Sequence, residues 1–288
     1  MDEGLGVLKG ARCPRLFLIS MAVGGAILAS PMPAGAHDFW IEPSRFNPSV
    51  GTEIGLGLRV GVNLEGEPIP RDPAHIRRFV MVGPEGASDV PGFFGADPAG
   101  YIRPASPGVY LVAYESFPTR IELPGEIFEK YLSEEGLEFA TQLRAERLQT
   151  PFPATERFSR CAKCLIRCGS IDTGPYRHAF GMTLELIPEA NPCLLAPGQN
   201  FSCRLLYRGK PLAGALVAAL SREEGFVRLS ERSDEEGRAS FILPHAGFWL
   251  IKAVHILERE GEDVEWESYW ASLTFELGNS DPTSQSDP

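Results

Sequence analysis

Short runs of β-branched and aromatic residues, separated by glycine and proline, dominate the first half of the chain. The clearest runs lie at residues 39–41, 54–62, 79–82 and 109–114. Turn-forming sequences stand between them, for example at 83–86 and 106–108. Runs of this length and spacing predict short antiparallel strands that pack as a small β-sandwich.

The period of the apolar positions changes between residues 126 and 148. Apolar residues recur there at steps of three and four among charged ones, at Phe128, Tyr131, Leu132, Phe139 and Leu143. This spacing predicts an amphipathic helix, with a kink at Gly136. A second helix is expected over 154–168, so that residues 125–170 would form a helical insertion.

Strand-like runs return near residue 178 and continue to residue 277. Within them, the order G-x-P-x-x-G-A, D-x-x-G-R and G-x-W resembles immunoglobulin-like modules of the prealbumin or adhesin type. The resemblance implies a second sandwich. We therefore expect a mainly β protein with two immunoglobulin-like or prealbumin-like β-sandwiches, at 37–124 and 171–277, on either side of the helical insertion. Residues 278–288 are expected to be a disordered tail.

Residues 1–36 have the layout of a secretory signal peptide. Three basic residues precede an apolar run at 16–29, and Ala34 and Ala36 supply the small residues of a cleavage site. The run is shorter than the about 20 residues that a membrane-spanning helix needs, so we expect a cleaved leader. Cleavage after Ala36 would leave His37 as the first residue of a periplasmic protein without membrane insertion.

Composition and net charge limit the classes of partner that the protein can be expected to bind. The chain is 43% hydrophobic and 23% charged, as in ordinary globular proteins, and its net charge is −11. Such a field repels phosphate backbones, so nucleic acid is not an expected partner. The sequence has no G-x-S-x-G elbow, Walker loop, dinucleotide-binding glycine motif or H-E-x-x-H, and no enzyme activity is expected from it.

An N-terminal His37 would offer two nitrogen donors to one metal ion. Its α-amino group and Nδ1 close a six-membered chelate ring, and an amine with a pKa of about 7.7–8.0 loses its proton readily to a metal at neutral pH. Imidazole suits copper, nickel, zinc and iron. The alternative is a frayed terminus without function. Asp38 and Glu42 are either further ligands or solvent-facing charges.

The other histidines differ in their predicted surroundings. His255 alternates with apolar residues on one strand face, so it is expected to be half-buried and to need a hydrogen-bond partner or a metal. His178 begins a strand and is either a ligand or a surface residue. His75 and His245 stand beside proline turns and are expected to be exposed, without a functional role.

Five cysteines follow the leader: Cys161, Cys164, Cys168, Cys193 and Cys203. On a helix the first three would share one face. An odd number in an oxidising compartment leaves at least one thiol unpaired, bound to metal or joined between chains. Cys193 and Cys203 could close a short loop. For the trio we favour a disulfide plus a buried thiol over a metal site, and the pairing stays open.

Four segments carry a wider resemblance: AHDFWIEPSRFNPSVG, LEGEPIPRDPAHIRRFVMVGPEG, FSRCAKCLIRCG, and FWLIKAVHILE followed by WESYWASLTFEL. They resemble an exported bacterial family, commonly described as the periplasmic component of a nickel/cobalt-type ABC transport system, with a domain of unknown function. The resemblance implies metal-site roles for His37 and His255. Cys161 matches a position of that family, whereas Cys164 and Cys168 are additions.

Together these features predict a periplasmic metal-binding protein that passes a divalent transition ion to an inner-membrane transporter. The candidate ligands are His37, His255, His178 and Asp38. Nickel or cobalt follows from the resemblance, copper or zinc from the ligand chemistry. Two other functions stay open on the same fold: a structural or adhesive module with an exposed aromatic patch, and a copper-dependent oxidative enzyme that pairs the terminal histidine with a second one.

Overall fold

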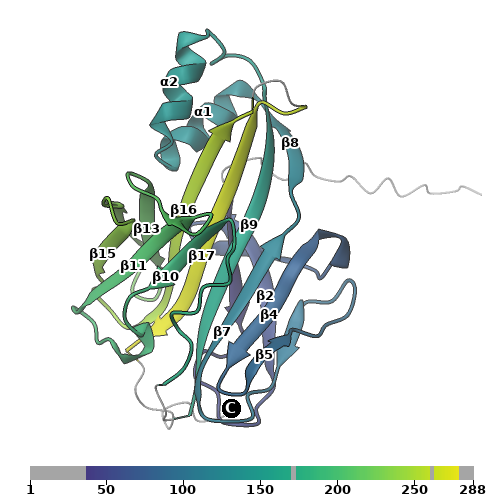
Figure 1. The fold of residues 1–288 in the computed structure, drawn as a ribbon, viewed down its shortest axis with the longest axis vertical. Helices are drawn as coiled ribbons and strands as arrows, with labels where there is room; N and C mark the ends of the chain where they lie inside the picture. Colours follow the sequence, from purple (N-terminus) through teal and green to yellow (C-terminus); the bar gives the residue numbers. More distant parts are fainter. Residues whose placement is uncertain (1–36, 170–172, 260–262, 279–288) are drawn as a thin grey trace, which may run out of the picture. The chain divides into compact units, whose positions relative to one another are not determined.

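A computed structural model describes residues 37–169, 173–259 and 263–278 (Figure 1). The expected signal peptide at 1–36 and residues 279–288 of the expected tail lie outside the described residues. The described chain is mainly β, with two helices, and it confirms the expected class. Neither helix is long and apolar enough to cross a membrane.

A nine-stranded sheet forms the middle layer. Its strand order is β14-β13-β16-β17-β9-β7-β4-β5, and β8 also pairs with β9. The strands are β4 (Ile76–Gly83), β5 (Gly86–Asp89), β7 (Gly108–Ser116), β8 (Thr119–Leu123), β9 (Ala154–Cys168), β13 (Leu216–Ser221), β14 (Val227–Arg232), β16 (Gly247–Glu258) and β17 (Trp266–Leu277). Neighbours are antiparallel except β17 and β9, which are parallel. One sheet therefore contains strands from both halves of the chain.

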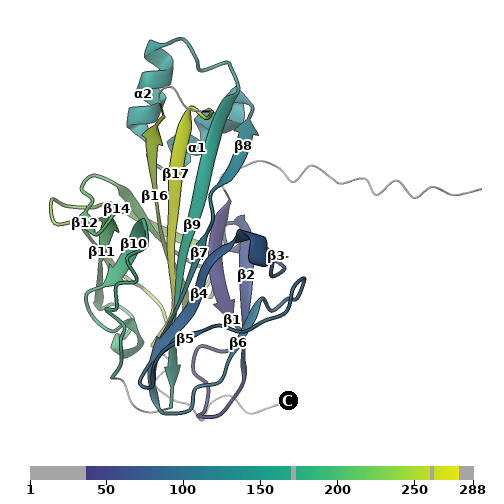
Figure 2. The ribbon, with the colours of Figure 1, turned by 45° about the vertical axis from the view of Figure 1, so that its right-hand side comes forward.

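Two smaller sheets cover the opposite faces of this large sheet (Figure 2). The first comprises β1 (Asp38–Pro43), β2 (Ile54–Val62), β3 (Glu65–Ile69) and β6 (Gly100–Ile102). The second comprises β10 (Leu184–Pro188), β11 (Asn200–Tyr207), β12 (Lys210–Pro211) and β15 (Arg238–Ile242). Neighbouring residues of β9 show the alternation, because Ile166 packs into the first core and Leu165 into the second. The two expected sandwiches thus share their middle layer.

The four strands expected in the first half all form, within β1, β2, β4 and β7. The expected run at 178–189 is a strand only over β10. Two short 3₁₀ turns complete the described elements, η1 (Pro73–His75) and η2 (Pro192–Leu194). The described parts of both sandwiches belong to one compact unit. The domain boundaries expected near residues 124 and 171 stay a prediction.

The helical insertion consists of α1 (Gly125–Glu134) and α2 (Glu138–Glu146). Gly136 has a φ of +63° between them, so the expected kink is a complete break. Phe128 and Tyr131 of α1 pack with Val254 of β16 and Trp266 of β17. The helices therefore cover one end of the two longest neighbouring strands.

The helix expected over 154–168 is wrong, because this segment is β9. The strand lies inside the large sheet, and both of its faces are covered, so residues 161–168 are all buried. A strand buried on both sides loses the apolar and polar alternation that identifies a strand in a sequence. The insertion is accordingly shorter than the 125–170 that we expected.

Candidate functional site

The start of β1 is firmly held between other elements. Phe39 and Trp40 are 5% and 1% exposed, and the backbone of β1 pairs with β2 from Asp38 to Pro43. His37 directly precedes the strand and is partly exposed. The expected metal ligand therefore directly precedes a fixed strand, and the choice between a ligand and a frayed terminus stays a prediction.

Asp38 points inward and contacts a buried lysine. Lys252 of β16 donates to the Asp38 carboxylate and, over 2.6 Å, to Oε1 of Glu135 at the end of α1. Burial by itself lowers the pKa of Lys252, but the charges of Asp38 and Glu135 outweigh it and raise that pKa above its ordinary value. Burial raises the pKa of Glu135. Asp38 therefore joins β1 to β16 and α1, and its carboxylate has an ammonium partner.

His255 lies on the other face of the large sheet. It continues the expected alternation with Trp249 along β16, and its ring centroid is 4.5 Å from that of Tyr207 on β11. Burial lowers the pKa of His255, which favours the neutral imidazole. Lys252 and His255 differ by three positions on one strand, so their side chains project to opposite faces. The sheet therefore separates His255 from the start of β1.

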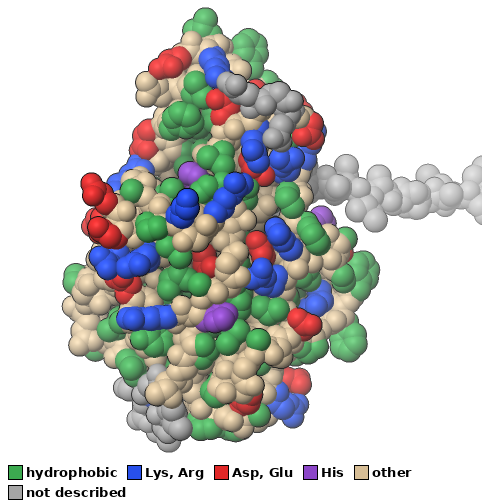
Figure 3. Space-filling model, in the orientation of Figure 1, with side chains coloured by type: hydrophobic (Ala, Val, Ile, Leu, Met, Phe, Trp, Pro, Cys, Tyr) green, Lys and Arg blue, Asp and Glu red, His purple; other side chains and the backbone are tan. Residues whose placement is uncertain are grey.

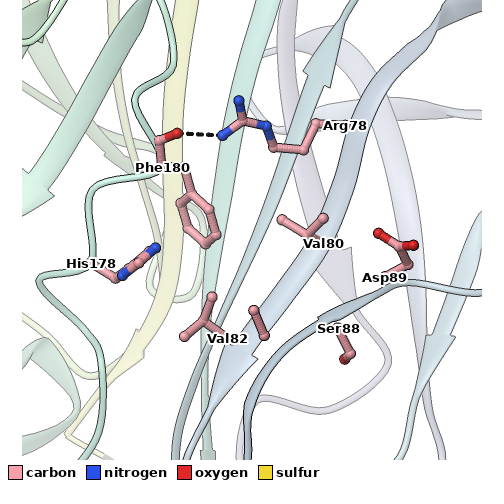
Figure 4. A pocket seen from close by; sticks show the side chains of 8 residues that line it. Arg78, Val80, Val82, Ser88, Asp89, His178 and Phe180 are labelled. Atoms are coloured by element: carbon pink, nitrogen blue, oxygen red, sulfur yellow. Dashed lines mark hydrogen bonds between the residues drawn. The ribbon is translucent and has the colours of Figure 1, made fainter.

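His178 lies in a third place, beside a cavity of about 450 Å³ that runs along β4 and β5 (Figure 4). Its ring packs edge-on against Phe180, with 4.7 Å between centroids, and Val80 and Val82 form the apolar part of the lining. Arg78 donates to the carbonyl oxygen of Phe180 at the rim. The lining of this cavity therefore combines apolar and polar side chains, and His178 is the only histidine among its lining residues.

The expected metal ligands do not converge on one point. Figure 3 shows histidine side chains well apart from one another on one face of the molecule. Within the part of the chain that the structure describes, no group of three or more His, Cys, Asp or Glu side chains is arranged to hold a metal ion. A site at His37 would therefore rely on the two nitrogens of that residue, together with groups near the start of β1.

A cavity of about 200 Å³ lies next to this start, which we call the β1 pocket. Its lining includes Phe39, Leu58, Ile69, Pro70, Asp72, His75, Tyr114, Ser116, Thr119, Phe158 and Arg160. Continuing the alternation of β1 by one residue puts His37 on the same side of the strand as Phe39. The β1 pocket is therefore the cavity on the side of β1 to which this alternation assigns His37, and its lining begins two residues later, at Phe39.

His75 reaches the β1 pocket from η1, and the turn chemistry explains its position. Asp72 caps the turn, since its Oδ1 accepts from the backbone N–H of Ala74 over 2.9 Å, and Pro73 supplies the first turn residue. The other carboxylate oxygen of Asp72 lies 3.6 Å from Nε2 of His75. This separation is longer than a hydrogen bond, so neither ring nitrogen of His75 is committed to Asp72.

The sequence identified the Asp72–Pro73 turn but assigned His75 no role. The missing information was the position of the turn, because η1 comes close to β1 only through pairing of β2 with β3 and of β4 with β7. Arg160 was missed for a different reason. It lies in the segment that we took for a helix, whereas on β9 it points toward the first sandwich.

Arg160 is enclosed by aromatic rings. Its guanidinium carbon lies 4.7 Å from the ring centroid of Phe39 and 5.2 Å from that of Phe158. Nη1 is buried and has no hydrogen-bond partner among the described residues. Burial lowers the pKa of Arg160 to about 10, and burial raises the pKa of Tyr114, on the adjoining β7, to about 12. At neutral pH the pocket thus presents a cation and a protonated phenol.

The cysteines do not form the expected site. Cys161 and Cys164 project to opposite faces of β9, and Cys164 and Cys168 are about 13 Å apart at about 3.3 Å per residue, too far for a disulfide. These three and Cys203 are free. The expected disulfide within the trio and the one between Cys193 and Cys203 are therefore wrong. Burial raises the pKa of Cys161, Cys164 and Cys203 to about 12, so their thiols stay protonated.

Residues 34–257 match the family model described as Domain of unknown function (DUF4198). The chain belongs to the DUF4198 family. The match spans the first sandwich, both helices, β9 and almost all of β16, so it includes the β1 pocket. Membership supports the unknown-function family in the resemblance described above, and it carries no link to nickel or cobalt transport. No curated protein matches the chain.

Two solved structures show weak similarity to this DUF4198 chain. The D0-D1 domain of intimin is 13% identical, with 83% of this chain and 97% of that chain covered and a TM-score of 0.20. A tetra-tandem repeat in the extending region of a large adhesion protein is 12% identical, with 85% and 50% covered and a TM-score of 0.21. At these TM-scores neither similarity supports an argument about function.

Proposed function

We propose that this DUF4198 protein is a periplasmic transition-metal-binding protein that acts as an accessory to nickel or cobalt uptake, with His37 as its main ligand. The observation that supports the proposal is that His37 is partly exposed and directly precedes the buried, paired start of β1. A held residue loses little freedom when it binds, so two donors on it can bind an ion without reorganising the fold.

The β1 pocket offers a further donor to such an ion. His75 is exposed over 60% of its side chain, so its imidazole is accessible to an ion. An amine and two imidazoles form a nitrogen-rich set, which suits nickel, cobalt, copper and zinc. Because His37 and His75 are both at the surface, the ion can exchange with a transporter without unfolding of the sandwich.

Calorimetric titration of the processed protein with Ni(II), Co(II), Cu(II) and Zn(II) tests the proposal. The comparison form retains Ala36 ahead of His37, which moves the free amine by one residue and removes the chelate ring. We expect this form to bind at least about tenfold more weakly, and His75→Ala to weaken binding less. His178→Ala is the matched control on the opposite side of the molecule. Equal affinity in the processed and extended forms would remove His37 from the site.

Sequencing the first residues of the protein from a periplasmic fraction tests the exported form. The proposal expects His37 as the first residue. A mature chain that begins elsewhere would lack the amine donor, and the chelate could not form.

A second candidate is a binding module, and exposed aromatic side chains favour it. Phe93 and Phe94 lie between β5 and β6 and are 77% and 79% exposed. Adjacent exposed rings of this kind mark protein or glycan contact sites. A glycan array probed with the protein and with a Phe93→Ser/Phe94→Ser variant distinguishes this function, since a module that uses the loop would lose its signals in the variant.

A further inference from the structure

Arg160 is half-buried with its Nη1 fully buried, and it differs from three buried cations of the described chain that have carboxylate partners. Lys163 contacts Glu185 over 2.8 Å, Arg144 contacts Glu129 over 2.6 Å, and Lys252 contacts two carboxylates. These side chains follow the rule that a buried charge is paired. No carboxylate among the described residues is within hydrogen-bond or ion-pair distance of the Arg160 guanidinium.

The acidic groups nearest to Arg160 have other partners. Asp38 and Glu156 act on it only through their fields. Asp38 accepts from Lys252, and Glu156 accepts from Ser268 and Tyr131. The buried Nη1 of Arg160 therefore keeps an unused donor, and the Arg160 side chain is part of the lining of the β1 pocket.

The surroundings of Arg160 define the ligand. Phe39 and Phe158 cover the guanidinium with their rings, which leaves its N–H edges as the groups available for a planar acceptor. Thr119 and the protonated phenol of Tyr114 add hydroxyl donors to the lining. Asp72 at the rim repels multiply charged anions. These groups match a singly charged carboxylate with a short apolar tail.

The size of the β1 pocket agrees with such a ligand. A volume of about 200 Å³ equals the space of about six or seven liquid water molecules at about 30 Å³ each. It is smaller than the roughly 300–1,000 Å³ of pockets for drug-sized ligands. The pocket can hold a molecule of roughly five to ten non-hydrogen atoms.

We propose that the β1 pocket is a binding site for a small monocarboxylate, whose carboxylate pairs with the Arg160 guanidinium and whose apolar part lies against Phe39 and Phe158. The inference rests on the unpaired cation and the shape of its surroundings. It does not depend on metal binding at His37.

Saturation-transfer NMR on the processed protein in EDTA tests this site separately from the metal proposal. The probes are propionate and butyrate, with inorganic phosphate titrated in parallel and followed by backbone amide shifts. We expect saturable carboxylate binding with shifts at Tyr114 and Thr119, and at least about tenfold weaker binding of phosphate. Equal binding of phosphate, or carboxylate binding that does not saturate, would overturn the proposal.

Two variants test the role of Arg160. Arg160→Lys keeps the charge but removes the planar fork, and we expect at least about fivefold weaker propionate binding. Tyr114→Phe keeps the ring packing and removes one hydroxyl, so it should weaken binding about two- to fivefold in a folded protein. Arg78→Lys, at the separate cavity of His178, is the matched control and should bind like the wild type. Unchanged binding in both pocket variants would place the ligand elsewhere and refute the assignment.

Discussion

Lys252 and Glu156 lie on the same face of the large sheet, and both are buried. Of these two residues, only Lys252 contacts an oppositely charged group within the described part of the chain. Glu156 instead accepts from the hydroxyls of Ser268 and Tyr131, the latter over 3.3 Å. Burial raises the pKa of Glu156 to about 7. The two residues therefore respond differently to mutation and to pH.

Replacing Lys252 should destabilise the protein strongly. Lys252→Met leaves Asp38 and Glu135 buried without their cation, and we expect a loss of about 3–5 kcal/mol in the free energy of unfolding. Urea unfolding measures it. Lys130→Met is the control, because this lysine is 71% exposed and pairs only with Glu134, so it should change stability by less than about 0.5 kcal/mol. Similar effects of both substitutions would contradict a structural role of the buried triad.

Glu156 should make the protein less stable as the pH rises toward and through 7. Its pKa is about 7 in the folded protein and ordinarily 4.5, so between these values the folded state binds the extra proton. The stabilisation is complete below about pH 4.5 and is lost as the pH rises through 7, by up to roughly 3 kcal/mol.

This pH-dependent loss of stability can be measured by urea unfolding of the wild type and of Glu156→Gln between pH 4.5 and 8. The variant keeps the shape and stays neutral, so its stability should fall less over the range. Glu122→Gln, on exposed β8, should keep the wild-type slope. A Glu156→Gln curve parallel to that of the wild type would show that Glu156 does not titrate in this range.

At the scale of elements, the local signals in the sequence predicted most of the strands, including the fully buried β7, and a kink at Gly136 where the structure has a break. They failed at β9, where the neighbour on one side is β17, more than a hundred residues later in the chain. That pairing leaves no trace in a local pattern. The same limit applies to the site: the start of β1 and the Asp72–Pro73 turn could be predicted from local sequence, but the meeting of Phe39 and Asp72 with Arg160 around one cavity depends on how distant strands pair.

The break between α1 and α2 should not tolerate a side chain. A Cβ at Gly136 would lie 2.7 Å from Nη2 of Arg232 and 2.9 Å from Cβ of Leu216, in addition to the strain of a φ of +63°. We expect Gly136→Ala to cost about 2–3 kcal/mol in thermal or urea unfolding. Gly209 has a φ of +74°, but a Cβ there would meet no atom within 4 Å. Gly209→Ala should therefore cost only about 1 kcal/mol. Equal costs would show that the contact with β13 and β14 has no effect.

At the scale of the whole molecule, the two sandwiches share the large sheet. β9 pairs with β7 of the first half on one side and with β17 of the second half on the other. Its side chains alternate between the two cores. The arrangement couples the stability of one core to that of the other.

We therefore expect the sandwiches to unfold in one transition. Leu165→Ala empties space in the second core and Ile166→Ala in the first, each at a cost of about 2–4 kcal/mol. Hydrogen exchange should report the same loss of protection in β2 and β11 for either variant. If Leu165→Ala lowered protection only in β11, the sandwiches would be independent, as the boundaries near residues 124 and 171 imply.

The place of β17 also sets an order for biosynthesis. This last strand lies between β16 and β9, so a nascent chain that ends after β16 has two long strands with open edges and no way to join them. Contacts that span so much of the chain form slowly. The middle layer can close only after β17 has been made, so the strands of its two halves join late in the synthesis of this part of the chain.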